Sequence, residues 1–250
     1  ENYMNMKKVF LFIVEGLSDK EALEPIVSEL LNDKKIYFKI LRCDLTAALD
    51  RRFYHHNMKE RIKIVIDEFL EMNRGIRKAD IEKLIYLTDI DGCYIASDYV
   101  FYSECDNCFR YEDDGIYTNR PETAIERNRL KSRNLNIINS TQEVYHFPIE
   151  VYYFSCNLDH VLHDERNMKQ ENKVVYAEAF ADQYEGCESK FINYISDDNL
   201  FPKCKYDQSW SHIKQDLNSL LKYSNFCLFF FHNFEYLTEE AKECIDKISL

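Results

Sequence analysis

The order in which apolar runs follow one another constrains this 250-residue chain more than any other feature of its sequence. Val9 to Val14 is apolar at every position, as expected for a central parallel strand that helices cover on both faces. Further strand-like runs lie at Ile36 to Leu41, Leu84 to Thr88 and Ile149 to Phe154, with helical patterns between them. Strands that alternate with helices predict an α/β fold in which a mostly parallel sheet is flanked by helices.

The segments between these strands have the apolar periodicity of helices. Ser18 and Glu21 have the spacing of a capping box at the start of the first helix. Pro25 lies beyond the first turn of that helix, where we expect it to introduce a bend. A second helix is expected around Ile62 to Leu70, and a charged third helix around Pro121 to Arg133. Each pair of parallel strands is thus joined by a segment with helical character.

The last third of the sequence has a mainly helical pattern. We therefore expect an α/β domain over residues 7–165 and a helical extension over residues 166–250. Phe226 to Phe231 fits either a late strand or a buried helical turn, and periodicity leaves the two open. Thr238 to Leu250 fits a short amphipathic helix. Residues 92–120 are rich in turn formers and interrupt the alternation.

Charge and cysteine content exclude several classes of protein. The chain has 32 Lys and Arg against 44 Asp and Glu, a net charge of −12, which argues against a protein that coats nucleic acid through bulk charge. No apolar run approaches the roughly 18 residues of a membrane-spanning helix, so no membrane association is expected. Nine cysteines, an odd number in a chain this long, favour reduced thiols in a cytoplasmic protein over a disulfide framework.

Acidic motifs follow two of the predicted strands. Glu15 to Asp19 comes directly after the first strand, and Asp89 and Asp91 come directly after the Leu84 strand. Because the carboxyl ends of parallel strands meet at one edge of a sheet, these carboxylates are expected to share a small volume. Two carboxylates about 4 Å apart repel by about 4 kcal/mol at an effective dielectric constant near 20. A hard divalent cation removes this repulsion, so the sequence predicts a site for Mg²⁺ or Mn²⁺.

The two motifs resemble those of a known domain. Glu15-Gly-x-Ser-Asp19 after one apolar strand, followed by Asp89-x-Asp91-Gly after another, is similar to the Toprim domain. The closer likeness is to Toprim nucleases of the overcoming-lysogenization-defect type, the nuclease of the PARIS system and RloB-like proteins. The resemblance covers residues 7–165 and implies a Toprim-like, Rossmann-like sheet. It assigns acid–base or metal chemistry to Glu15 and Mg²⁺ binding to Asp89 and Asp91.

Two further metal ligands follow from the same resemblance. Asp19 matches a ligand seen in the overcoming-lysogenization-defect branch. Asp159 comes after the Ile149 strand, where relatives carry one more acidic residue, although here Asp stands in place of the more usual Glu. The gap between Glu15 and Asp89 is also longer than in a minimal Toprim domain.

The resemblance implies a metal-dependent endonuclease. Such a nuclease hydrolyses phosphodiester bonds in RNA, with tRNA as one candidate, or in DNA. A chain of this size suits an anti-phage defence effector that is controlled by a partner, for which a sensor ATPase is the expected candidate. We also expect the chain to form a homo-oligomer. These statements on regulation rest on analogy with the family.

A basic run lies in the expected third helix. It consists of Arg127, Arg129, Lys131 and Arg133. One interpretation has these side chains contacting substrate phosphates beside the metal edge. The other is a solvated helix face, because helical spacing spreads the four over more than one side and acidic neighbours partly neutralise them.

Other functions stay open at this point. Leu84 to Gly92 also satisfies the signature of a haloacid-dehalogenase-type phosphatase, with Asp89 as nucleophile and Asp91 as acid, although this motif normally opens that fold. A non-catalytic partner module is a third possibility. Cys105-x-x-Cys108 suggests a zinc site, but the sequence lacks a second paired motif and ordinary thiols are the simpler interpretation.

Overall fold

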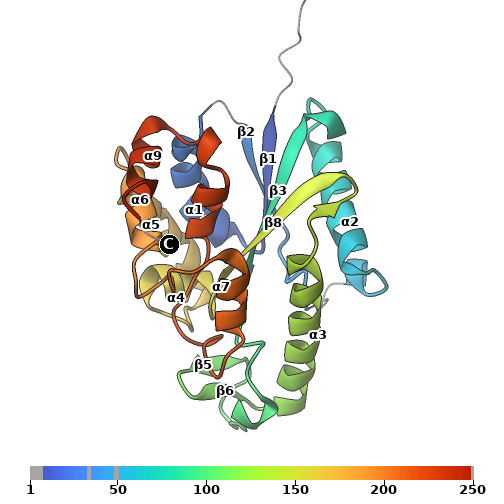
Figure 1. Ribbon diagram of the computed structural model, residues 1–250. Coiled ribbons are helices and arrows are strands. Elements are labelled where there is room, and N and C mark those ends of the chain that lie inside the picture. The colour runs from blue at the N-terminus through green and yellow to red at the C-terminus, as the bar shows by residue number, and fades with distance from the viewer. Residues whose placement is uncertain (1–7, 33–34, 48–50, 249–250) are drawn as a thin grey trace, which may run out of the picture.

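The computed structural model describes residues 8–32, 35–47 and 51–248, and Figure 1 shows the arrangement of its elements. Its centre is a five-stranded sheet with the order β2 (Lys35–Ile40), β1 (Val9–Val14), β3 (Ile81–Asp89), β8 (Phe147–Phe154) and β7 (Glu143–Val144). The first four strands are parallel to one another, and β7 runs antiparallel to β8. The α/β class and the mostly parallel sheet are thus confirmed.

Helices cover both faces of this sheet (Figure 1). On one face lie α2 (Met58–Met72) and α3 (Pro121–Asn139), and on the other lies α1 (Leu17–Leu30) together with helices from the C-terminal part. Side chains of β1 alternate between the two hydrophobic clusters: Leu11 packs with the α2 side and Phe12 with the α1 side, and both are 0% exposed. Burial on both faces explains why β1 is apolar at every position.

The C-terminal part is helical, as expected. Its helices are α4 (Leu158–His163), α5 (Gln170–Asp182), α6 (Ser189–Ile195), α7 (Tyr206–Ile213), α8 (Cys227–His232) and α9 (Glu239–Ile245). Short 3-10 helices lie at Arg51–Phe53, Lys78–Asp80, Ser97–Tyr99 and Phe234–Tyr236. The Phe226 to Phe231 run is helical and makes up most of α8. The aromatic rings of α8 pack onto the sheet beside Phe12. Several of these helices share one hydrophobic cluster with β1, and the domain boundary near residue 165 stays a prediction.

Three details of the expected helices are wrong. The first helix begins at Leu17, so Asp19 occupies its third position and accepts the Gly16 N–H at 2.8 Å, in place of a cap at Ser18. The third helix continues past Arg133 to Asn139. The last helix ends at Ile245; positions 249–250 of the expected helix lie outside the described residues.

A small second sheet occupies the stretch that the sequence marks only as turn-rich. It consists of β4 (Val100–Tyr102), β6 (Gly115–Thr118) and β5 (Arg110–Glu112), in that order across the sheet. A Cβ at Gly115 would lie 2.3 Å from the Tyr99 carbonyl oxygen, so this close approach requires glycine. Figure 1 shows β5 and β6 beyond the carboxyl ends of the parallel strands, where they cover the edge of the main sheet.

No helix among the described residues combines the length and the apolar character that crossing a membrane requires.

Candidate active site

The two acidic motifs lie side by side because β1 and β3 are neighbouring parallel strands. Ile13 of β1 pairs with Tyr86 of β3, so both strands end at the same edge. Glu15 is the first residue after β1, and the Thr88 hydroxyl near the end of β3 donates to its Oε1 at 2.9 Å. The expected pairing of these strands is confirmed, and it brings Glu15 next to the Asp89 motif.

Glu15 lies in a strongly acidic environment. Burial is the largest cause that raises the pKa of Glu15 well above its ordinary value, and the charges of Asp44, Asp89 and Asp91 raise it further. The ammonium of Lys131 acts in the opposite direction but does not compensate. The three carboxylates of the two motifs therefore interact with one another directly.

Asp89, at the end of β3, is held by the helix that follows the neighbouring strand β8. Its Oδ1 accepts the N–H of Leu158, the first residue of α4, at 2.9 Å. Burial raises the pKa of Asp89 well above its ordinary value, and the carboxylates of Asp19 and Asp91 add to the shift. Lys131 and Lys173 oppose it. The backbone of α4 thus fixes a carboxylate whose charge is not balanced.

Asp91 is placed by an unusual turn. Its φ is 53°, in the left-handed region, and Gly92 follows with a φ of 65°. A Cβ at Gly92 would lie 2.5 Å from Leu220, so the turn admits only glycine there. The Asp91 N–H donates to the Cys156 carbonyl at 2.6 Å, and the Tyr111 hydroxyl donates to its Oδ1 at 3.2 Å. Hydrogen bonds therefore fix both the backbone N–H and the carboxylate of Asp91.

A buried lysine joins Asp91 to a residue that the sequence analysis missed. Lys131 is 0% exposed, and its Nζ lies 2.7 Å from Asp91 Oδ2 and 2.6 Å from Asp44 Oδ2. Burial disfavours the charged lysine, but Asp44, Asp91 and Glu15 outweigh it and raise the pKa of Lys131 well above its ordinary value. Asp44 lies four residues beyond the end of β2, so the rule of strand ends that located Glu15 and Asp89 would have found it only if applied beyond the residues directly after the strand.

The two remaining predicted ligands lie on the other side of Asp89. Burial, with the charge of Asp159 in support, raises the pKa of Asp19 to about 6, although the Gly16 N–H and Lys173 lower it. Asp159 is buried, and its Oδ2 lies 2.6 Å from Lys173 Nζ. Asp19, Asp89 and Asp159 thus interact with one another around Lys173 of α5, a residue that no sequence motif indicated.

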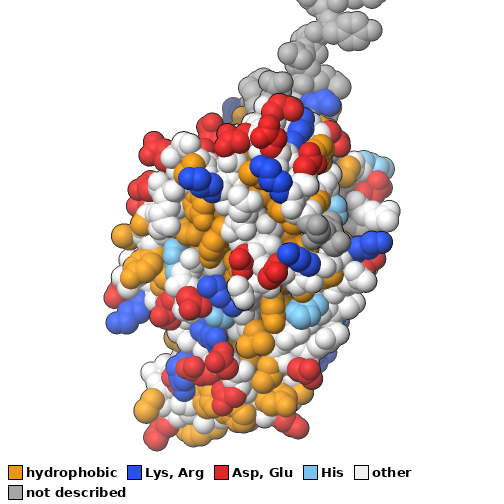
Figure 2. Space-filling model, turned by 60° about the vertical axis from the view of Figure 1, so that its left-hand side comes forward, with side chains coloured by type: hydrophobic (Ala, Val, Ile, Leu, Met, Phe, Trp, Pro, Cys, Tyr) orange, Lys and Arg blue, Asp and Glu red, His pale blue; other side chains and the backbone are white. Residues whose placement is uncertain are grey.

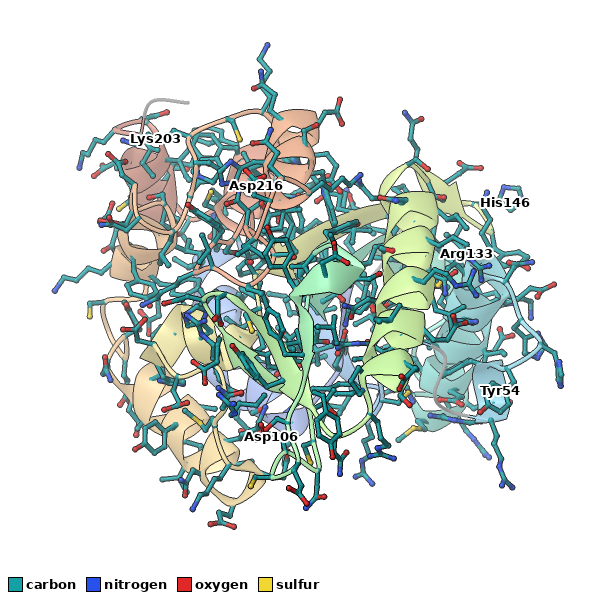
Figure 3. The ribbon with its side chains drawn as sticks, turned by 90° about the horizontal axis from the view of Figure 1, so that it is seen from below. Tyr54, Asp106, Arg133, His146, Lys203 and Asp216 are labelled. Atoms are coloured by element: carbon teal, nitrogen blue, oxygen red, sulfur yellow. The ribbon has the colours of Figure 1, made fainter. Side chains whose placement is uncertain are left out.

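The four basic side chains of the α3 run have different surroundings. Arg127 and Lys131 are buried and point toward Asp91, whereas Arg129 and Arg133 are exposed. Arg129 forms an ion pair with Glu126 at 2.7 Å. Arg133 lies on the side of α3 that faces α2, away from Asp106 of the small sheet (Figure 3). The helix therefore does not present one basic face.

Figure 2 shows how charges are distributed over one face of the molecule. Acidic and basic side chains are interspersed there, and no continuous basic surface is visible on that face. This agrees with the net charge of −12. A substrate phosphate would have to be recognised locally, at the sheet edge, rather than by a broad basic surface.

Cysteines form no metal site in the described part of the chain. Cys105 and Cys108 are exposed free thiols, and all nine cysteines are free. Among the described residues, no group of three or more histidine, cysteine, aspartate or glutamate side chains is arranged to hold a metal ion. A structural zinc ion, which takes four protein ligands, has no such set here.

A cavity of about 520 Å³ opens beside the acidic edge. Asp89 and Asp91 line it together with residues of the small sheet, of the 166–168 segment and of α5.

Comparisons of the chain with protein family models, with curated proteins and with solved structures gave no match. Interpretation of the site therefore rests on its own geometry and charge.

Proposed function

We propose that the protein is a metal-dependent endonuclease that hydrolyses phosphodiester bonds in RNA or DNA with Mg²⁺ or Mn²⁺. The observation that carries the proposal is a pair of carboxylates, Glu15 and Asp89, that lie at one sheet edge and have no cationic partner among the described residues. Among the described residues, no lysine or arginine forms an ion pair with Glu15, Asp19 or Asp89, and burial together with neighbouring acids raises the pKa of all three. Such an arrangement suits a cation.

The donor set fits a hard cation rather than a soft one. The side chains of Glu15, Asp19 and Asp89 offer carboxylate oxygens, which favour Mg²⁺ or Mn²⁺ over zinc. Mg²⁺ commonly keeps several waters and binds through one or two carboxylates plus substrate phosphates, so it needs no group of three converging protein ligands. Glu15 and Asp89 are the residues that would hold it, with Asp19 beside them. Asp91 and Asp159 are already engaged by Lys131 and Lys173.

The bound cation would supply charge neutralisation at a phosphodiester oxygen and an activated water. The chain's own residues orient the reaction. Leu158 N–H and the Thr88 hydroxyl fix the carboxylates of Asp89 and Glu15. Lys131 fixes the carboxylate of Asp91 and offsets part of the negative charge of Asp44 and Asp91, which a phosphate at this edge would otherwise face. Glu15, whose pKa is raised, is suited to accept and return a proton.

The remaining parts of the proposal rest on the motif resemblance. They are a Toprim-like fold for the sheet, an anti-phage role, control by a sensor ATPase and self-association. The haloacid-dehalogenase-type phosphatase remains the alternative, because it uses Asp89 and Asp91 at the same strand end. It assigns no role to Glu15, which makes Glu15 the residue that separates the two chemistries.

Incubation with tRNA, single-stranded RNA and plasmid DNA, in Mg²⁺, Mn²⁺ or EDTA, tests the proposal. We expect cleavage that requires the metal and that Asp89→Asn abolishes. Asp216→Asn is the matched control, because Asp216 is exposed and lies on the α7 side, away from Asp106 and the cavity (Figure 3). Cleavage that persists in EDTA or in Asp89→Asn would contradict the assignment.

A further inference from the structure

The cavity beside the acidic edge has two walls that come from distant parts of the chain. One wall is the 105–111 segment, which leads into β5 of the small sheet, and the other is the 166–168 segment before α5. Asp89 and Asp91 line the same cavity of about 520 Å³. A ligand in this space would therefore lie directly against the carboxylates of the proposed metal site.

Hydrogen bonds hold the two walls together. Asn167 Oδ1 accepts the Tyr111 N–H at 2.9 Å, and its Nδ2 donates to the Tyr111 carbonyl at 2.8 Å. Arg166 forms an ion pair with Asp113 at 2.7 Å, and its own carbonyl accepts from Asn157 at 2.8 Å. The cavity is thus formed in advance, and a ligand need not order its walls.

The lining of the cavity suits a nucleoside. Phe109 lines it and is partly exposed, and aromatic side chains of this kind stack on bases in single strands. The guanidinium of Arg127 lies 4.7 Å from the centre of the Phe109 ring and supports its orientation. Asn107 is exposed and lines the cavity; its Oδ1 accepts from Asn119 Nδ2 at 2.9 Å, and its own amide N–H groups are donors for the polar edge of a base.

The charge of the lining suits a phosphate once a divalent cation is bound. The ionic side chains that line the cavity are Asp89, Asp91, Asp106, Arg110, Arg166 and Lys173. A bound Mg²⁺ would offset the carboxylates at this end of the cavity, and the three cations in the lining are groups that a phosphate can approach. Arg166 lines the same cavity, and a phosphate oxygen is a strong acceptor for a guanidinium.

The size of the cavity decides between single and double strands. A space of about 520 Å³ lies in the range of pockets that hold one small organic ligand, so it admits one nucleotide. A base inside a duplex is stacked and paired and cannot enter unless it is extruded. Building on the nuclease function proposed above, we infer that this cavity takes one unpaired nucleotide, with its base on Phe109 and its phosphate toward Asp89, and that the substrate is single-stranded.

A tryptophan placed in the cavity would report the stacking. The chain has one tryptophan, Trp210, which is 2% exposed and gives a constant background. Phe109→Trp is titrated with a short single-stranded RNA, with the same sequence as a duplex and with uridine 5′-monophosphate, in Ca²⁺. We expect saturable quenching by the single strand and about tenfold weaker binding of the duplex, the loss expected from one stacked base at about 1.4 kcal/mol. Phe101→Trp is the matched control, because Phe101 lies on β4 outside the cavity lining.

Three outcomes would overturn the inference: equal binding of single strand and duplex, no quenching by any ligand, or quenching by the mononucleotide alone. Cleavage assays on the wild-type chain with the same RNAs separate this inference from the proposed function. Cleavage without quenching, or cleavage of duplex alone, overturns only the cavity assignment. Quenching by the single strand without cleavage in Mg²⁺ or Mn²⁺ overturns the nuclease function and leaves the nucleotide site.

Discussion

Strands β3 and β8 carry two polar clusters that differ in how their charges are satisfied. Away from the carboxyl edge, Lys83 Nζ lies 2.6 Å from Glu150 Oε1 and 2.7 Å from Asn233 Oδ1, and Asn233 returns a bond to Glu150 Oε2 at 2.9 Å. The Tyr152 hydroxyl donates to Glu150 and contacts His232 Nδ1 at 2.9 Å. We call these five residues the β3–β8 network. Its single carboxylate, Glu150, forms an ion pair with Lys83.

The carboxyl edge is arranged differently. Asp44 and Asp91 share Lys131, but Glu15 and Asp89 have no ion-pair partner among the described residues. A buried charge without a partner destabilises a fold, so it persists only where another purpose retains it. The comparison therefore separates a network that fastens α8 to the sheet from an edge that is suited to bind a ligand.

The largest expected effect follows from removal of the buried cation at the edge. Lys131→Met should lower the free energy of unfolding by about 3 kcal/mol, because it leaves the half-buried Asp44 without an ion-pair partner among the described residues. Asp91 would keep only the longer ion pair with Arg127, whose Nη1 lies 3.6 Å from Asp91 Oδ2. Urea denaturation followed by circular dichroism measures the change. Lys59→Met is the control, since Lys59 is an exposed residue at the start of α2. An unchanged midpoint would show that the ion pairs around Lys131 do not form as described.

The second prediction tests whether the unbalanced carboxylate next to Asp89 takes part in chemistry. Glu15→Gln keeps the acceptor for the Thr88 hydroxyl but cannot carry a proton, so we expect nuclease activity to fall by about 10²–10⁴. A phosphatase that uses Asp89 as nucleophile would retain hydrolysis of p-nitrophenyl phosphate in the same variant. Measurement of both activities distinguishes the two functions. Full nuclease activity in Glu15→Gln would remove the acid–base role.

The third prediction compares one carboxylate from each cluster with the same substitution. Asp89→Asn should raise the free energy of unfolding by about 1 kcal/mol without metal, because it removes a half-buried charge that has no ion-pair partner among the described residues and keeps the bond to Leu158. Glu150→Gln should lower it by about 1–3 kcal/mol, because Lys83 loses its ion pair. Thermal denaturation in EDTA gives both values. The same sign in both variants would refute the distinction between the clusters.

Much of the fold and part of the edge could be predicted from sequence. Burial makes β1 and the Leu84 to Leu87 part of β3 apolar, which identifies both strands and the acidic residues at their ends, Glu15 and Asp89. Asp44 was missed although the strand at Ile36 to Leu41 was predicted, because Asp44 lies four residues beyond the end of β2 and not directly after it. The environment of Lys131 could not be predicted, since helical periodicity does not show that a charged side chain points inward to a carboxylate.

The small sheet and Lys173 lie beyond sequence reasoning for a different reason. Strands of three or four residues, such as β4 and β5, are too short to show an alternating pattern, so their segment is indistinguishable from a series of turns. Lys173 reaches Asp159 because α5 packs against α4, which carries Asp159. Both features depend on tertiary contacts, and both line the cavity that is proposed to bind substrate.

The smallest expected effect concerns the pH dependence of the β3–β8 network. The pKa of His232 is lowered, chiefly by burial; the charge of Glu150 raises it and that of Lys83 lowers it further. The uncharged side chains of Tyr152 and Tyr206 also face the ring. The folded state therefore binds fewer protons than the unfolded state below the unfolded pKa of about 6.5. Stability should fall slightly as the pH drops below about 6.5, because His232 is exposed and solvent screens the effect. Urea denaturation of His232→Gln at pH values of about 7.5 and 5 should show a smaller loss than the wild type, and an equal loss would mean that the network tolerates the protonated ring.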